Sequence, residues 1–349
     1  MRRKFFVSWV AVACLTLAVS VVPAGAQQRR ASGSARTKTT TTPANAFAAL
    51  PLPASDGVMF VDMRRLLTEA VPRVLGGDAT RLAGVNADIE EFKTRTGVDA
   101  RAVERVAVGV RLTNPSPDVT KIDNIVVVAR GAFDLNTIVT RLSAKGQHRE
   151  EKFGGKTIHI FTLNEQMKMF GVMPRTRVSD LAVASLDAAT LAIGEPVAVR
   201  ATIDAGAGRA PLVSSQLVSL AQSSPAAIVG FGANLPASLL QKAQGIGDDN
   251  LDKAVASIRQ IYGSVGTSAS GIDTLTSLRT QTAADAAQLS TALTALKGLG
   301  AFAVMQMSGD KQRLAQHALD SLQINAQGND VSLRLSLAQA DVATLLRVL

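Results

Sequence analysis

Hydrophobic side chains along residues 49–210 follow two alternating periods. Stretches with an apolar residue at every second position, or at every position, predict β-strands, and stretches with a spacing of three or four predict α-helices. The expected strands are 57–62, 106–112, 125–129, 147–153, 156–162, 181–186 and 190–193, and the expected helices are 63–75, 79–96, one behind Asp134 and one from Pro196. Hairpins interleaved with helices predict an α+β fold with antiparallel sheets and packed helices.

Short-range signals mark where these elements begin and end. Asp78 is placed to cap the helix over 79–96, and Gly97 is placed to end it. Pro72 is expected to kink the preceding helix or to end it early, because proline cannot donate a backbone hydrogen bond. Gly154 and Gly155 are typical of a two-residue hairpin turn between two strands.

Residues 211–349 repeat this order loosely. The expected strands are 226–231, 258–268, 272–280, 322–326 and 331–337, and the expected helices are 236–243, 284–299, 311–319 and 342–349. The order strand, helix, strand pair, helix, hairpin, helix is therefore shared by a first half, 49–210, and a second half, 211–349. A divergent duplication explains this order, and so does chance, since α+β chains often repeat such orders.

The first 26 residues have the pattern of an export signal. Arg2, Arg3 and Lys4 precede the apolar run 5–22, and Ala24-Gly25-Ala26 supplies the small residues that a signal peptidase accepts. The sequence thus predicts an exported protein, periplasmic or extracellular, with no transmembrane anchor after cleavage. Two alternatives stay open: an uncleaved anchor, because 18 apolar residues approach the length of a membrane span, and lipidation at Cys14.

The excess of positive charge lies mostly at the N-terminus. The net charge is +9, but the leader and the Ser/Thr-rich, basic segment 27–48 carry most of it, so the remainder is nearly neutral. The segment 27–48 is too polar to bury surface and is expected to be a flexible tether. Binding of nucleic acid usually requires a basic stripe with stacking aromatic residues. With one tyrosine in the whole chain, we expect no nucleic-acid partner.

Reactive side chains are few once the leader is removed. Cys14 is the only cysteine, so no disulfide, thiol nucleophile or cysteine-based zinc site is expected. His148, His159 and His317 lie far apart in the sequence without HxH or HExxH spacing, which predicts no metal site. Because His159 alternates with Ile158 and Ile160, it is expected to face solvent.

Other candidate motifs are incomplete. Glu150-Glu151 and Asp248-Asp249 are expected in solvated turns or edges. Gly266–Ser270 lacks the second glycine of a nucleophile elbow, and Ser308–Lys311 has a Ser-x-x-Lys pattern without the motifs that accompany it in hydrolases. Residues 230–235, GFGANL, have leucine where a dinucleotide fingerprint has its third glycine. The two glycines are expected instead to leave room on a strand for a neighbouring element to pack closely. We therefore expect no enzyme and no cofactor.

One apolar segment does not fit a regular core element. Residues 167–174, MKMFGVMP, are broken by Gly171 and Pro174 and flanked by basic residues. Three interpretations stay open: a loop that plugs the end of the sheet, an exposed lip that contacts an apolar partner, and a thioether site for cuprous copper. The residues of the candidate lip are Met167, Met169, Phe170 and Met173.

Three stretches carry a resemblance to a known group. ARGAFDLNTIV, EEKFGGKTIHIF and LAVASLDAATLAIGEPVAVRATID resemble the recurring order of bacterial exported proteins of unknown function, over residues 125–208. The resemblance implies an exported α+β domain and no catalytic residue. Together these patterns predict a non-enzymatic interaction or scaffold protein of the cell envelope, whose partner is an envelope protein. The alternative is a periplasmic carrier of an apolar ligand, either a lipid or a hydrophobic peptide.

Overall fold

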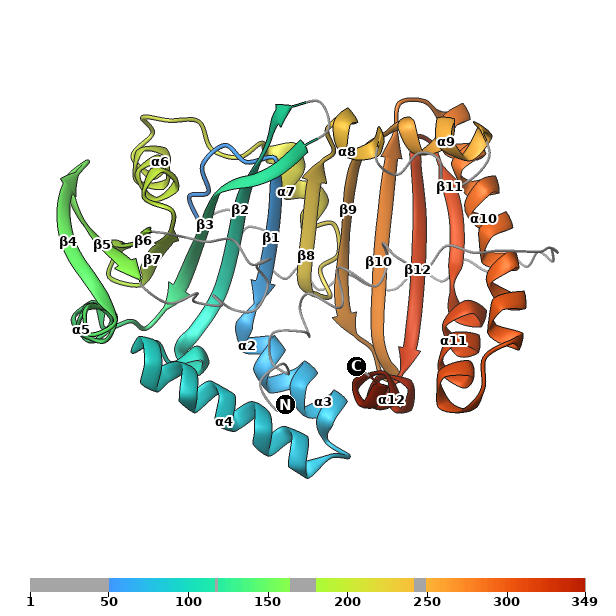
Figure 1. The fold of residues 1–349 in the computed structure, drawn as a ribbon, viewed down its shortest axis with the longest axis horizontal. Helices are drawn as coiled ribbons and strands as arrows, with labels where there is room; N and C mark the ends of the chain where they lie inside the picture. Colours follow the sequence, from blue (N-terminus) through green and yellow to red (C-terminus); the bar gives the residue numbers. More distant parts are fainter. Residues whose placement is uncertain (1–49, 117–118, 164–179, 242–248, 349) are drawn as a thin grey trace.

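A computed structural model of the chain describes residues 50–116, 119–163, 180–241 and 249–348. The strands are β1 (Gly57–Asp62), β2 (Val103–Ser116), β3 (Val119–Gly131), β4 (Gly146–Phe153), β5 (Lys156–Leu163), β6 (Asp180–Asp187), β7 (Thr190–Gly194), β8 (Ala227–Asn234), β9 (Ile258–Thr267), β10 (Gly271–Thr280), β11 (Gln323–Gln327) and β12 (Asp330–Ala338). They form one 12-stranded antiparallel sheet in the order β11-β12-β10-β9-β8-β1-β2-β3-β7-β6-β5-β4 (Figure 1). The predicted α+β class is confirmed.

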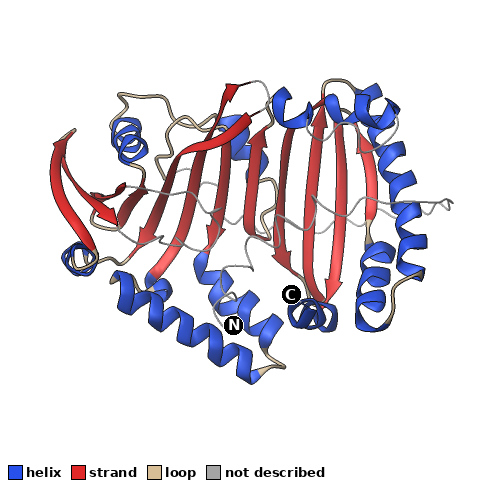
Figure 2. Cartoon of the chain, in the orientation of Figure 1, coloured by secondary structure: helices blue, strands red, loops and turns tan. Residues whose placement is uncertain are grey.

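Helices lie along both faces and around the rim of this sheet (Figure 2). They are α2 (Met63–Arg65), the π-helix η1 (Leu66–Ala70), α3 (Val71–Leu75), α4 (Ala79–Thr96), the 3-10 helix η2 (Ala100–Ala102), α5 (Leu135–Ser143), α6 (Pro196–Gly206), α7 (Ser215–Ala221), α8 (Ala237–Gln241), α9 (Asp249–Ala256), α10 (Ala283–Met305), α11 (Gly309–Ser321) and α12 (Gln339–Val348).

The first half of the sheet is buried on both faces, as the alternation of β1 illustrates. Val58 and Phe60 belong to a core cluster with α6 and α7, whereas Val61, on the opposite face, packs with α2 and α5. Successive side chains of a strand point to opposite faces, so a strand buried on both sides reads as continuously apolar. Smaller clusters join α8, α9 and α10 to β12, and α3 to α12.

The predicted helix ends are confirmed, with one difference. The side chain of Asp78 accepts a hydrogen bond from the amide of Arg81, and Gly97 has the left-handed φ of 77° that ends α4. The predicted helix over 63–75 does not end early at Pro72. It runs to Leu75 and contains the π-helical turn η1 just before the proline. A wider turn accommodates a residue that lacks an amide proton and crowds the preceding turn.

The two halves meet at the centre of the sheet, where β1 pairs with β8. Outward from this pair, the first half continues β2-β3-β7-β6 and the second half continues β9-β10-β12-β11. The last hairpin of each half, β6–β7 and β11–β12, occupies the corresponding place in this order, and the first half has one further hairpin, β4–β5. The shared strand order agrees with the order read from the sequence, and the duplication itself stays a prediction.

Several elements differ from the sequence prediction in extent. Strand β2 continues through Ser116, beyond the expected strand end at residue 112. Helices α7 and α9 were not predicted, since each spans only about two turns, too short to define a period. Helix α10 extends six residues beyond the expected end at Leu299. The leader 1–26 and the tether 27–48 lie outside the described residues.

Candidate functional site

The C-terminal end of α10 is an exposed apolar surface. Thr282 begins this helix by capping, and its last eight residues, 298–305, contain no charged side chain. Within it, Leu299, Phe302 and Met305 have exposed fractions of 38%, 63% and 66%, and Met307 follows with 39%. We call these four residues the apolar helix end. Helix α10 stands beside the edge strand β11 (Figure 1), so no strand among the described residues covers its outer surface.

A hollow of about 320 Å³ lies between α10 and β11. Lys297 donates a hydrogen bond of 2.6 Å to the carbonyl of Leu322 across it. The residues that line it are Thr294, Lys297, Leu322, Gln323, Ile324 and Asn325. Polar side chains such as Gln323 and Asn325 lie among the apolar ones, so the hollow lacks the predominantly apolar lining of a lipid pocket.

A second group of side chains lies at the opposite edge of the sheet, on the hairpin β4–β5. The turn Gly154-Gly155, with φ of 57° and 78°, sets a register in which Glu150 pairs with His159 and His148 pairs with Phe161. Residues 148 and 150 project from the same face of β4, and their partners project from the same face of β5. We call His148, Glu150 and His159 the histidine cluster.

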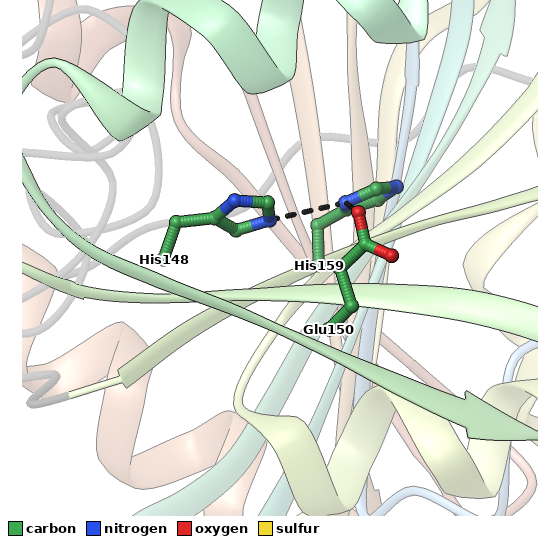
Figure 3. Close-up of side chains that lie close together, drawn as sticks. All are labelled: His148, Glu150 and His159. Atoms are coloured by element: carbon green, nitrogen blue, oxygen red, sulfur yellow. Dashed lines mark hydrogen bonds and ion pairs between the residues drawn. The ribbon is translucent and has the colours of Figure 1, made fainter.

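The histidine cluster converges on one ring nitrogen (Figure 3). Nδ1 of His159 lies 3.2 Å from Nε2 of His148 and 3.4 Å from Oε1 of Glu150. The ring of His148 stacks on the ring of Phe161, with centroids 4.8 Å apart and planes at 14°. Burial lowers the pKa of His159 below its usual range, against the opposing effect of the carboxylate of Glu150. Burial therefore favours the neutral form of the His159 imidazole.

This cluster corrects two expectations. His148 and His159, although far apart in the sequence, are in contact across the hairpin. The side chain of His159 does not face open solvent but is 12% exposed, because α5 packs against β4 and β5. The information was present in the sequence: a two-residue turn at Gly154-Gly155 fixes the cross-strand partner of every residue in the hairpin, and counting outward pairs Glu150 with His159.

The remaining candidates have structural partners. Glu151 lies on the edge strand β4 as expected, with a side chain that is 31% exposed, and it forms an ion pair with Arg200 of α6. His317 on α11 lies 2.9 Å from the carboxylate of Asp341 on α12. The expectation for the glycine segment is confirmed: a Cβ at Gly230 would lie 2.0 Å from the carbonyl oxygen of Ala221, so the strand is thinned to admit α7.

The candidate lip of Met167, Met169, Phe170 and Met173 lies outside the described residues. Its three interpretations therefore stay as predictions.

The described residues define a class of protein: an α+β protein built on one antiparallel sheet, with an apolar helix end at one edge and a histidine cluster at the other. None of its described helices has the length and hydropathy that a membrane crossing requires.

No protein-family model and no curated protein matches the sequence, in agreement with the expectation that it resembles no family of known activity. Among solved structures, crystal form III of TP0453 is similar with a TM-score of 0.43 and 8% sequence identity, over 86% of this chain and 97% of that chain. Crystal form IV of TP0453 has a TM-score of 0.42 and 10% identity, over 87% and 98%.

Proposed function

We propose that this chain is an exported, non-enzymatic protein of the cell envelope that acts as an interaction or scaffold component. The observation that carries the proposal is the apolar helix end. Phe and Met are enriched in the buried parts of protein interfaces, and contiguous exposed apolar side chains on a folded protein mark contact sites. Export is supported by residues 1–26, which have a basic start, an apolar run and small residues at the expected signal-peptidase cleavage site.

The partner that this surface fits is a protein with a complementary apolar surface. Three of its side chains lie on successive turns of one helix, at spacings of three, so they form a ridge that can insert into a groove. Such a contact requires a few large anchors rather than a wide area, and Phe302 and Met305 are the most exposed of the four.

The alternative, a carrier of an apolar ligand, requires an apolar cavity between sheet and helices. On both faces of the first half this space is occupied by fully buried side chains such as Phe161, Ile158 and Val199. The hollow beside α10 has a lining that mixes polar and apolar side chains. These observations favour the scaffold over the carrier.

The proposal is tested by co-sedimentation of the purified protein with envelope membranes from its source. The variant Leu299→Ser/Phe302→Ser/Met305→Ser is expected to fold normally, because all three side chains are exposed, and to sediment at least about tenfold less. A matched control replaces three exposed apolar residues elsewhere, Val197, Leu212 and Leu239, which are 59%, 53% and 38% exposed. Membranes treated with protease should lose the binding if the partner is a protein.

Two results would overturn this function. One is a wild-type protein that does not sediment with membranes at all. The other is equal sedimentation of the α10 variant and the control. The same assay tests the candidate lip with a variant in which Met167, Met169, Phe170 and Met173 are replaced by serine. Retained folding with weaker membrane binding would support an exposed lip. Loss of folding would indicate that the segment packs in the core.

A further inference from the structure

The histidine cluster brings three potential metal ligands to one point. The donor atoms Nε2 of His148, Oε1 of Glu150 and Nδ1 of His159 all lie within 4.8 Å of one another. A single proton cannot satisfy this arrangement. If Nδ1 of His159 carries a proton, it can donate fully to only one of the two groups that face it.

We propose that His148, Glu150 and His159 bind one divalent transition-metal ion of the zinc type, with water in the remaining coordination position. Two imidazoles and a carboxylate form a ligand set that Zn²⁺ accepts, and a site with three protein ligands keeps one position open. The proposal does not depend on the function of the apolar helix end, which lies at the opposite edge of the sheet.

The spacing of the donor atoms supports a tetrahedral ion. At zinc-ligand distances of about 2.0–2.1 Å, neighbouring donors of a tetrahedron are separated by about 3.3 Å. The two separations measured from Nδ1 of His159 are 3.2 Å to His148 and 3.4 Å to Glu150. The third separation, between the donors of His148 and Glu150, is within 4.8 Å, and the two imidazole rings are stacked at 24° to each other. Rotation of these side chains would therefore have to bring the donors together around the ion.

The hairpin holds the ligands in place before an ion binds. Glu150 and His159 are directly opposite each other in the antiparallel register, and His148 lies two residues along the same strand. Stacking on Phe161 restricts the ring of His148. Lys152, the next residue on this face of β4, donates to the hydroxyl of Thr157, so its ammonium group has a partner of its own. Preorganisation of this kind lowers the cost of ordering ligands around the ion.

A bound ion would link β4 to β5 at the free edge of the sheet. Edge strands are weak points because one side of the backbone is unpaired, and within the described sheet β4 pairs with β5 only. The hairpin β4–β5 is also the part that the first half has in addition to the shared strand order. We expect the ion to act as a cross-strand clip on this hairpin.

The test is calorimetric titration of the chelator-treated full-length protein with Zn²⁺. One site per chain is expected, and His148→Gln or His159→Gln should weaken binding by more than about tenfold, since even residues that only orient a ligand change affinity by 10- to 100-fold. Glu150→Gln should weaken binding in the same direction. His317→Gln is the matched control. His317 also lies beside a carboxylate, at 2.9 Å from Asp341, but it belongs to no group of three potential ligands among the described residues.

A second measurement uses the wild-type chain and avoids any effect of substitution on folding. Diethyl pyrocarbonate modifies accessible imidazoles, and mass spectrometry of the peptides reports each histidine. Zn²⁺ should protect His148 and His159 and leave the modification of His317 unchanged. The proposal is overturned if the wild-type protein shows no saturable site, if His148→Gln/His159→Gln binds as well as the wild type, or if Zn²⁺ protects all three histidines equally.

Discussion

The guanidinium of Arg200 on α6 donates two parallel hydrogen bonds to the carboxylate of Glu151 on β4. Nε lies 2.7 Å from Oε1, and Nη2 lies 2.6 Å from Oε2. These bonds from the guanidinium hold the pKa of Glu151 below its usual range, and the carboxylate in turn raises the pKa of Arg200. The pair ties the edge strand β4 to a helix on the face opposite the histidine cluster. The ion pair therefore holds the hairpin β4–β5 against the rest of the protein.

Replacement of Glu151 by Gln should lower the free energy of unfolding at pH 7 by about 1 kcal/mol, near the upper end for ion pairs with partial exposure, because the geometry is bidentate. Since the folded pKa of Glu151 lies below its unfolded value, the contribution is present above the unfolded pKa and is lost as the pH falls through the folded pKa. Urea denaturation from pH 7 to pH 3 checks both points.

The matched control for this substitution is Glu69→Gln. Glu69 forms an ion pair of 3.1 Å with Arg65, one turn away on the same helical segment, and such pairs contribute about 0.3–0.5 kcal/mol. A difference between wild type and Glu151→Gln that persists unchanged at pH 3 would show that the ion pair is not its source.

The single tyrosine of the chain, Tyr262, should titrate at an unusually high pH. Burial is the largest cause that raises the pKa of Tyr262, and the negative charge of Asp330 raises it further. The guanidinium of Arg279, 5.5 Å from the ring centre, has the opposite effect. A spectrophotometric titration of tyrosinate reports this residue alone, and its midpoint should lie above the usual value near 10. Asp330→Asn should lower the midpoint, whereas Asp310→Asn on α11 should not change it.

The same shift predicts a loss of stability at alkaline pH. Because the folded pKa of Tyr262 is raised, its contribution to stability is complete below the unfolded pKa and is lost as the pH rises through the folded pKa. A normal titration midpoint would mean that the ring is hydrated rather than buried between β9 and its neighbours.

Gly230→Ala should destabilise the protein by about 1–3 kcal/mol, the usual range for an overpacked site. The new Cβ would lie 2.0 Å from the carbonyl oxygen of Ala221, so α7 would have to move away from β8. Gly84→Ala is the matched control, since nothing lies within 4 Å of its Cβ position in α4. That substitution should stabilise by about 0.5–1 kcal/mol. Thermal unfolding of the two variants should therefore shift in opposite directions.

Thr282→Ala should loosen the beginning of α10. The hydroxyl of Thr282 accepts a hydrogen bond from the amide of Asp285, and the carboxylate of Asp285 accepts one from the amide of Thr282. Loss of this capping box should cost about 1 kcal/mol and speed amide exchange in the first turn. Thr291→Ala, in the middle of the same helix, should be neutral or stabilising, because its hydroxyl only bonds back to the carbonyl of Ala287. Equal exchange rates in both variants would argue against the cap.

Local interactions were readable from the sequence. The caps Asp78 and Asp134, the stop at Gly97 and the turn at Gly154-Gly155 all act within a few residues, so neighbouring residue types suffice to predict them. The α+β class and most hairpins followed from the two hydrophobic periods. The contact of His148 with His159 also follows from the predicted hairpin once its register is counted.

Only the tertiary structure decided which surfaces are covered. Helix α10 is apolar on nearly all sides, so no hydrophobic face distinguishes its buried residue Leu289 from its exposed residue Phe302; that depends on where β11, α9 and α11 lie. The joining of the halves through β1 and β8, the ion pair between Glu151 and Arg200 and the approach of Ala221 to Gly230 likewise connect distant parts of the chain. Sequence periodicity determines which residues share a face of an element, whereas packing against remote segments determines whether that face meets protein or solvent.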